Sequence, residues 1–177
     1  MRLEPPFYVI SDTHWFHKNI VRYANRPMGH NEIMVKRWHE TVTNDDVVLH
    51  LGDVVFTRNK EKNDRFFDEI GPNLPGDKYL ILGNHDPDEW IERYEAAGFK
   101  VIDPFGFDYL GWYVDFDHYP LLGLRHKQRI RVHGHIHNNT FHEEFTSQDL
   151  GGNVNVSVEV IDYTPQPIVD LLDRAIA

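Results

Sequence analysis

Cysteine is absent from this 177-residue sequence, which excludes disulfide bonds, thiolate nucleophiles and cysteine-ligated zinc. Long hydrophobic runs are absent too. No stretch approaches the length of a membrane span, and the N-terminal residues lack the apolar core of a signal peptide. We therefore expect a cytoplasmic protein without a membrane partner.

Basic residues are few. The chain has 18 Lys and Arg against 28 Asp and Glu, a formal net charge of −10, and no run of more than two basic residues. Proteins that bind nucleic acid through its phosphates usually carry an excess of basic residues. The composition therefore disfavours an extended nucleic acid as partner, unless bound metal ions reverse the local charge. It does not define an oligomeric state.

The hydrophobic and aromatic contents, 41% and 13%, are typical of a folded protein, and the length predicts one domain over residues 1–177. Short apolar runs rich in β-branched residues predict six strands, at 7–11, 46–51, 78–82, 112–116, 129–133 and 154–160. Periodicity and capping residues predict four helices, at 31–42, 62–70, 87–97 and 166–177.

The order of these segments predicts an α/β fold, because each of the first three strands is followed by a helix, as in βαβ units. The later strands follow one another closely and predict hairpins, with 104–111 as a turn region. Residues 138–152 are polar and aperiodic, which predicts a loop beside a site. Asn31 and Asp86 are the expected N-caps of their helices.

Polar residues end five consecutive predicted strands, and ligands gather at the carboxyl ends of strands in open α/β sheets. These residues are Asp12 with His14, Asp53, Asn84 with His85 and Asp86, His118, and His135 with His137. Each motif alone has an ordinary explanation, such as a turn or a helix cap. Five in succession predict a metal site.

The run His133 to His137 contains three imidazoles on one face of an extended segment, since alternate side chains of a strand point to the same side. His135 and His137 lie at the strand end, where we expect ligands. His133 lies deeper in the strand and is expected to be buried or to support the ligands. His50 is expected in the core.

The number and type of candidate ligands point to two ions. Seven residues are too many for one tetrahedral ion but suit two ions that share a bridging carboxylate. Imidazole, carboxylate and amide donors without thiolate favour Mn, Fe, Zn, Co or Ni over Mg or Ca, and we expect Mn first. Two such ions form a clamp for the hydrolysis of phosphoesters.

The same motifs resemble those of the calcineurin-like metallophosphoesterases, which run D-x-H, G-D, G-N-H-D/E, a lone His and G-H-x-H. Order and spacing agree from residue 12 to residue 137. The segments "SDTHWFHKNI", "HYPLL", "HGHIH" and "NVSVEV" look most like the small bacterial and phage-type members.

The resemblance implies a two-sheet β-sandwich flanked by helices, with two divalent ions at one edge of the sheets. One ion would be held by Asp12, His14, Asp53 and His137. The other would be held by Asp53, Asn84, His118 and His135, so that Asp53 bridges. A hydroxide bridging the ions would attack phosphorus. His85, which is not a ligand in this scheme, would stabilise the transition state or protonate the leaving oxygen.

The second motif departs from that of the protein serine/threonine phosphatases, which read G-D-x-x-D-R. Here the sequence is "GDVVFTR", with Phe56 in place of the second Asp. The carboxylate that orients the catalytic His in those enzymes is therefore missing. Either Asp86 replaces it, or His85 is held less tightly. The departure disfavours a protein phosphatase.

We expect a phosphodiesterase that acts on small phosphoesters or nucleotides. The alternatives are a nuclease on DNA or RNA ends, a phosphomonoesterase and, least favoured, a metal-dependent binding module without catalysis. The presence of His85 argues for catalysis. The residues expected to contact the substrate are His17, Asn84, Asn138 and Arg58.

Overall fold

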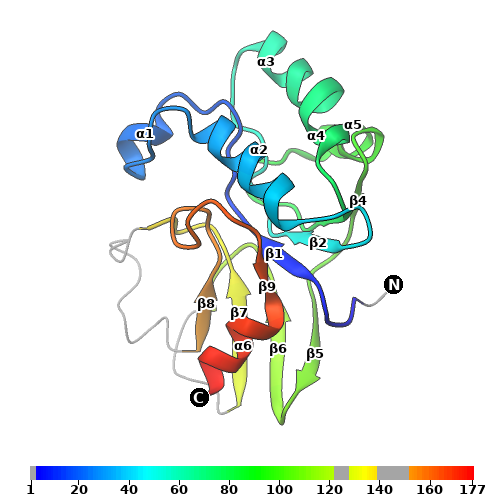
Figure 1. Ribbon diagram of the computed structural model, residues 1–177, viewed down its shortest axis with the longest axis vertical. Helices are drawn as coiled ribbons and strands as arrows, with labels where there is room; N and C mark the ends of the chain where they lie inside the picture. The colour runs from blue at the N-terminus through cyan, green and yellow to red at the C-terminus, as the bar shows by residue number, and fades with distance from the viewer. Residues whose placement is uncertain (1–2, 122–127, 139–151) are drawn as a thin grey trace.

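The computed structural model describes residues 3–121, 128–138 and 152–177. It contains two β-sheets that pack against each other (Figure 1). The first has the order β4-β3-β2-β1-β9 and comprises β1 (Tyr8–Ile10), β2 (Val47–His50), β3 (Asp77–Leu80), β4 (Phe99–Val101) and β9 (Gln166–Pro167). The second has the order β5-β6-β7-β8 and comprises β5 (Phe105–Tyr109), β6 (Trp112–Phe116), β7 (Arg129–His133) and β8 (Asn153–Asn155).

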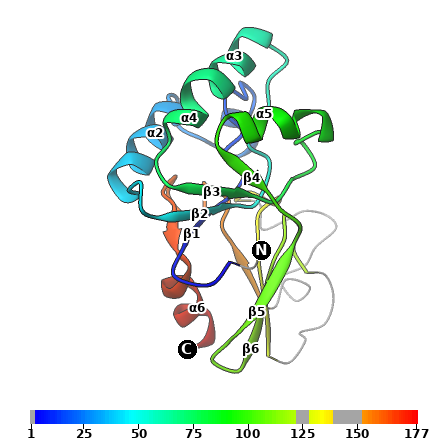
Figure 2. The ribbon, with the colours of Figure 1, turned by 90° about the vertical axis from the view of Figure 1, so that its right-hand side faces the viewer.

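The helices lie mainly on one side of the first sheet. They are α1 (Ile20–Tyr23), α2 (His30–Thr41), α3 (Lys60–Arg65), the π-helical turn η1 (Phe66–Ile70), α4 (Gly71–Asn73), the 3-10 turn η2 (Asp88–Trp90), α5 (Ile91–Ala96) and α6 (Ile168–Ile176). Figure 2 shows α2, α4 and α5 on one side of this sheet, with the second sheet and α6 on the other. No helix of the described residues is long and apolar enough to cross a membrane.

Strands β1 to β4 are parallel, and β9 is antiparallel to β1. A parallel sheet covered on both faces needs apolar residues on both faces. In β2, Val48 and Leu49 are accordingly both fully buried. The predicted α/β fold with two sheets and flanking helices is confirmed.

An aromatic cluster joins the two sheets. Phe7, just before β1, lies 5.5 Å from Phe116 of β6 and 6.4 Å from Phe107 of β5, measured between ring centroids. Phe116 also stacks on Phe105 at 5.1 Å. Because Phe116 is fully buried and touches both sheets, it fixes how one sheet sits on the other.

The predicted turn region at 104–111 is wrong, because residues 105–109 form β5. Gly106 in this segment allows close packing of the two strands. A Cβ at Gly106 would lie 2.7 Å from the carbonyl oxygen of Val114 on β6. The predicted hairpins among the later strands are also wrong, since β6, β7 and β8 are parallel. The antiparallel pair is β5 with β6, and β5 lies in the segment predicted as a turn.

The strand predicted at 154–160 is also wrong beyond Asn155. The β-branched residues that suggested a strand are buried, but so is Ser157 between Val156 and Val158, so the burial does not alternate as in a strand with one exposed face. The chain nevertheless leaves the second sheet and pairs with the end of β1, where Ser11 N donates to Val156 O and Val158 N donates to Ser11 O. Most of the loop predicted at 138–152 lies outside the described residues.

Besides β5, four short elements were not predicted from the sequence: α1, α4, β4 and β9. The predicted N-cap Asn31 is also wrong. Helix α2 begins at His30 after Gly29, whose φ of 80° is left-handed. The Asn31 side chain instead accepts a hydrogen bond from Phe16 N.

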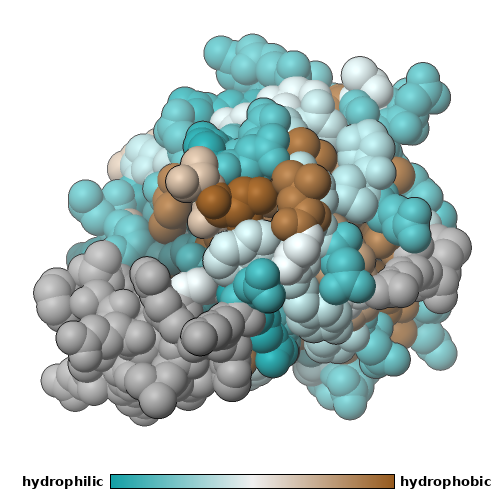
Figure 3. Space-filling model, turned by 90° about the horizontal axis from the view of Figure 1, so that it is seen from below, coloured by the Kyte–Doolittle hydropathy of each residue, from teal (hydrophilic) through white to brown (hydrophobic). Residues whose placement is uncertain are grey.

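Seen from the end that carries the tips of β5 and β6, the surface has a band of hydrophobic side chains within a hydrophilic surround (Figure 3). Leu110, between β5 and β6, is 72% exposed. It therefore contributes little to the core and provides a reference position for stability.

Substitution Phe116→Ala should lower the free energy of unfolding by about 3–5 kcal/mol, because it removes a buried ring and leaves a cavity between the sheets. Leu110→Ala should change it by less than about 0.5 kcal/mol. Urea denaturation of both variants measures the difference. Equal effects would contradict the role of Phe116 in joining the sheets.

His50, at the end of β2, is buried as expected. Its Nδ1 accepts a hydrogen bond from Gly52 N, and its Nε2 lies 3.0 Å from Thr13 Oγ1. A ring nitrogen that accepts a hydrogen bond carries no proton, so this histidine is neutral. Burial lowers the pKa of His50 to about 3.

His50 should make the protein sensitive to acid. In the unfolded chain, His50 has a pKa near 6.5. Between pH 6.5 and 3 it is therefore protonated in the unfolded chain but not in the folded chain. The free energy of unfolding therefore falls as the pH falls through this window, by about 2 kcal/mol at pH 5 for this group. Urea denaturation in EDTA at pH 7 and pH 5 should show a smaller loss in His50→Gln. An identical loss in both proteins would contradict this assignment.

Candidate metal centre

The polar residues at the strand ends converge where the two sheets meet. The backbone turns sharply there, because five candidate ligands have positive φ: Asp12, His14, Asp53, His135 and His137. This left-handed conformation is uncommon for residues other than glycine, and such residues tend to cluster at functional sites. Backbone hydrogen bonds from Asp12 N to Gly52 O and from His14 N to Asp53 O hold the first two turns.

Two groups of potential ligands result. Within each group, the ligand atoms all lie within 4.8 Å of one another. The first group contains Asp12, His14 and His137, and the second contains Asp53, His118 and His135.

Asp53 connects the two groups. Its Oδ2 lies 3.4 Å from His14 Nε2 in the first group and 3.6 Å from His118 Nε2 in the second. Asn84 completes the second group, since its Oδ1 lies 3.0 Å from His118 Nε2 and 2.9 Å from His135 Nδ1. The structure therefore brings together all seven residues that the sequence marked as candidate ligands.

The chemistry of this cluster fits bound cations. Asp12 and Asp53 are almost completely buried. The ring of His14 is buried as well, and neither of its nitrogens has a hydrogen-bond partner among the described residues. Buried charges and unpaired polar atoms are unfavourable unless something compensates them, and metal coordination does so. The donors are imidazole, carboxylate and amide, a set that suits transition metals.

Both carboxylates are predisposed to be charged. Burial alone would raise the pKa of Asp12, but the neighbouring His118 and His137 outweigh it, and the pKa is lowered. Burial alone would also raise the pKa of Asp53, but His14 and His118 lower this pKa well below the usual range. Ionised carboxylates are the form that binds metal.

A buried ion pair supports the first group from behind. Glu159 Oε1 accepts hydrogen bonds from His137 Nδ1 at 3.0 Å and from Arg26 Nε at 2.7 Å. Arg26 also donates to the carbonyl oxygens of Asp12 and Thr13. Since Glu159 occupies Nδ1 of His137, the Nε2 atom is left to face Asp12, at 4.0 Å from its Oδ1.

Hydrogen bonds fix the carboxylate of Asp12 as well. Its Oδ2 accepts from His135 N at 2.9 Å and from Ser157 Oγ at 3.0 Å. Sequence reasoning missed Arg26, Ser157 and Glu159. The available signals were a charged residue in the apolar "NVSVEV" segment and the proximity of Arg26 to the first motif, and neither indicates a contact across 133 residues.

The predicted N-cap role of Asp86 is wrong. The carboxylate accepts from the backbone N of Asp53, Val54 and Gly83 and from the hydroxyl of Tyr94. Helix α5 begins only at Ile91, after η2. Asp86 therefore fixes the turn that presents Asp53. Burial raises the pKa of this carboxyl.

His85 is exposed and lies beside the first group. Its ring centroid is 5.5 Å from that of His14 and 4.3 Å from that of Phe56. Phe56, which stands where protein phosphatases have an Asp, thus packs on His85 directly. The carboxylate of Asp86 is engaged elsewhere, so the ring is positioned by packing. Partial burial lowers the pKa of His85, which keeps it neutral at pH 7.

A groove of about 820 Å³ opens beside the first group and His85. His17 and Arg58, two of the expected substrate contacts, line it. Burial lowers the pKa of His17 to about 4, so this ring is neutral. Asn84 lies with the second group instead. Asn138 donates to Ala24 O and is not among the lining residues.

Comparison with known proteins agrees with this geometry. Residues 5–168 match the family model of the calcineurin-like phosphoesterases. The chain is 34% identical over 173 residues to an uncharacterised protein, MJ1445, of Methanocaldococcus jannaschii, covering 96% of this chain and 90% of the relative. It is 26% identical over 159 residues to the gene 66 protein of Mycobacterium phage L5, covering 72% of this chain and 75% of that protein.

A solved structure is similar over nearly the whole chain. It is that of AQ665, a protein of unknown function from Aquifex aeolicus, with a TM-score of 0.71 and 26% identity. The match covers 96% of this chain and 98% of the other. Together with the two ligand groups, these similarities show that the chain belongs to the calcineurin-like phosphoesterase family and is a metal-dependent phosphoesterase.

Proposed function

We propose that this protein is a phosphodiesterase that hydrolyses small or nucleotide phosphodiesters with two divalent ions, of which manganese is our first choice. The observation that carries the proposal is the position of Asp53 between two ligand groups, next to His85 and an open groove. Sites with two metal ions are typical of enzymes that hydrolyse phosphoesters.

Each ion would have four protein ligands. The first would be held by Asp12, His14, Asp53 and His137, and the second by Asp53, Asn84, His118 and His135. When bound, such ions supply positive charge for the phosphate oxygens and a water made more acidic for attack. The hydrogen bonds from Ser157 to Asp12 and from His137 to Glu159 fix the directions of these ligands.

His85 would act on the ester oxygen that leaves. It is exposed at the mouth of the groove, next to His14, and neutral at pH 7, so it carries one N–H for donation. Donation of that hydrogen bond, or of a proton, stabilises the charge that develops on the leaving oxygen. Phe56 keeps the ring in place through packing rather than through charge.

The groove favours diesters over monoesters. It extends from His14 and His85 to Asn19 and Tyr23, which leaves room for a substituent on the far side of the phosphate. A monoester would use only the end next to the ligand groups. Basic residues in the lining favour a second candidate, hydrolysis of nucleic acid strands near their ends.

With Mn²⁺, the protein should hydrolyse bis-p-nitrophenyl phosphate faster than p-nitrophenyl phosphate, and EDTA should abolish the activity. His85→Ala should lower kcat for the diester by about 100-fold or more, the usual loss for a general acid. His39→Ala, an exposed histidine of α2, is the matched control and should have no effect. Preference for the monoester would contradict the diesterase assignment, and full activity of His85→Ala would contradict the role of His85.

Glu159→Gln should weaken Mn²⁺ binding about 10- to 100-fold, because the neutral amide no longer fixes His137 or increases its basicity. Isothermal titration of the protein with Mn²⁺ measures the change. Thermal unfolding in EDTA checks that the variant is folded, since Arg26 also loses its charged partner. Glu40→Gln, an exposed acid of α2, should bind Mn²⁺ as the wild type does. Wild-type affinity in Glu159→Gln would overturn the assigned role.

A further inference from the structure

The groove beside the first ligand group has a charge that the chain as a whole lacks. Its lining includes Lys18, Arg58 and Lys62 but no Asp or Glu. In the complete sequence, acidic residues outnumber basic ones by 28 to 18. The excess of basic over acidic residues in this lining is therefore a local feature. It attracts anions to the groove, although the chain as a whole is acidic.

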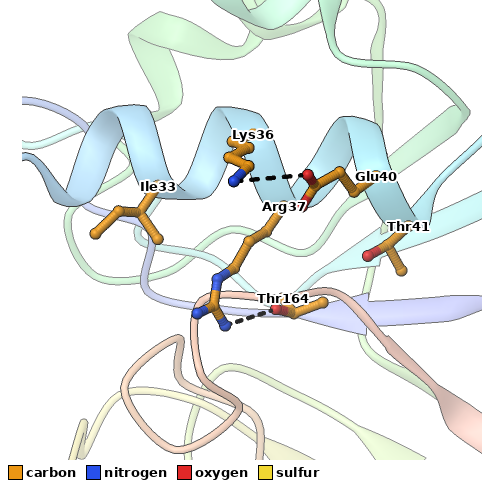
Figure 4. A pocket seen from close by; sticks show the side chains of 6 residues that line it. All are labelled: Ile33, Lys36, Arg37, Glu40, Thr41 and Thr164. Atoms are coloured by element: carbon orange, nitrogen blue, oxygen red, sulfur yellow. Dashed lines mark hydrogen bonds and ion pairs between the residues drawn. The ribbon is translucent and has the colours of Figure 1, made fainter.

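Other surface hollows do not share this property. One lies between α2 and Thr164, has a volume of about 430 Å³ and contains Lys36, Arg37 and Glu40 (Figure 4). There Lys36 pairs with Glu40, and Arg37 bonds to Thr164. Another, along α3 and η1, is lined by two basic and four acidic residues: Lys60, Arg65, Glu61, Asp64, Asp68 and Glu69.

The three basic side chains of the groove are available to a ligand. All three are exposed, and none forms an ion pair with a carboxylate in the part of the chain that the structure describes. The nearby Asp64 is occupied by Lys60 and Arg93, at 2.5 and 2.8 Å. The positive charge is therefore not neutralised from within the protein.

Aromatic side chains alternate with these cations. Tyr23, at the end of α1, is 68% exposed and lies 6.2 Å from the ring of His17. Phe16 lies below the cationic groups of Lys62 and Arg65, at 6.0 and 5.7 Å from its ring centroid. Exposed tyrosine next to basic residues is the combination that binds unpaired bases and their phosphates.

The size of the groove argues for more than one phosphate group. Its volume of about 820 Å³ is near the upper end of the roughly 300–1,000 Å³ found for pockets of drug-sized ligands. A duplex would hide the faces of its bases from Tyr23, whereas a single strand exposes them. The lining residues come from segments 14–23 and 56–62, with His85 and His137 at the end next to the ligand groups. Both segments lie in the half of the molecule that carries α1 and α3 (Figure 1).

We infer that the groove binds a short single-stranded oligonucleotide, with one phosphodiester at the ligand groups and His85. The adjoining phosphates contact Lys18, Arg58 and Lys62, and a base stacks on Tyr23. The inference rests on the proposed phosphodiesterase function and assigns its substrate class. It also limits the strand to a few nucleotides, because the chain as a whole carries a net charge of −10 and its surface beyond the groove repels a longer polyanion.

Binding is measured by fluorescence anisotropy of a fluorescein-labelled eight-nucleotide DNA strand with Mn²⁺ in the His85→Ala background, in which hydrolysis is slow and the ligand groups are not left as uncompensated carboxylates. Three neutralised phosphates predict that log K falls with log salt at a slope of about −2, from −0.7 per phosphate on single strands. Lys18→Ala/Arg58→Ala should reduce this slope to about −0.7 and weaken binding at least tenfold. Lys36→Ala/Arg174→Ala removes two exposed charges elsewhere, lowers the net charge equally and should bind as the wild type does.

The stacking contact is tested separately. Tyr23→Ala should weaken binding about tenfold or more, and Tyr23→Phe should restore it, because the ring and not the hydroxyl stacks on the base. The inference would be overturned if the two charge variants lost the same affinity, or if a duplex bound more tightly than the single strand. Binding of polyglutamate with the same affinity as the single strand would also overturn it. So would the absence of binding.

Assays with Mn²⁺ distinguish this inference from the proposed function. Hydrolysis of bis-p-nitrophenyl phosphate without any oligonucleotide binding would leave the diesterase standing and overturn the groove assignment. Oligonucleotide binding that responds to the variants, without hydrolysis of any diester, would support the groove and contradict the diesterase. If both hold, the ratio of kcat/KM for the oligonucleotide to that for bis-p-nitrophenyl phosphate should fall at least tenfold in Lys18→Ala/Arg58→Ala.

Discussion

Two buried carboxylates, Asp12 and Asp53, lie among four imidazoles where the two sheets meet, and much of the surrounding structure holds them there. Burying such charges is unfavourable unless opposite charge or hydrogen bonds compensate it. Three devices contribute: backbone donors to Asp12, the Glu159–Arg26 pair behind His137, and Asp86 below the turn that presents Asp53. The remaining compensation is what a pair of cations would supply.

This arrangement requires unfavourable backbone conformations. Five of the candidate ligands have left-handed backbone conformations, each unfavourable by about 1–3 kcal/mol. The aromatic cluster around Phe116 and the apolar faces of the parallel sheet provide the stability that permits such strain. The close approach of Gly83 to Asp53 shows how tightly the turns fit, since a Cβ at Gly83 would lie 2.4 Å from Asp53 Oδ1.

The sequence predicted the candidate ligands better than the residues that hold them in place. Asp12, Asp53 and His135 could be predicted from the sequence, because strand ends meet at one edge of a sheet and position along the chain therefore implies position in space. Glu159 and Asp86 could not be, because their roles depend on contacts between segments far apart in the chain. The continuation of β8 was mispredicted for a similar reason: the β-branched residues continue after Asn155, while the hydrogen-bond partner changes from β7 to the end of β1. The basic groove could not be predicted from the net charge, because the net charge sums over the whole chain and does not show where the charges lie.

The central claim is that Asp53 joins two metal ions. Its most direct test is a crystal structure of the protein with Mn²⁺, with the ions located by anomalous scattering. We expect two peaks about 3.5–4 Å apart, one on each side of the Asp53 carboxylate. A single peak, or peaks that Asp53 does not contact, would contradict the claim.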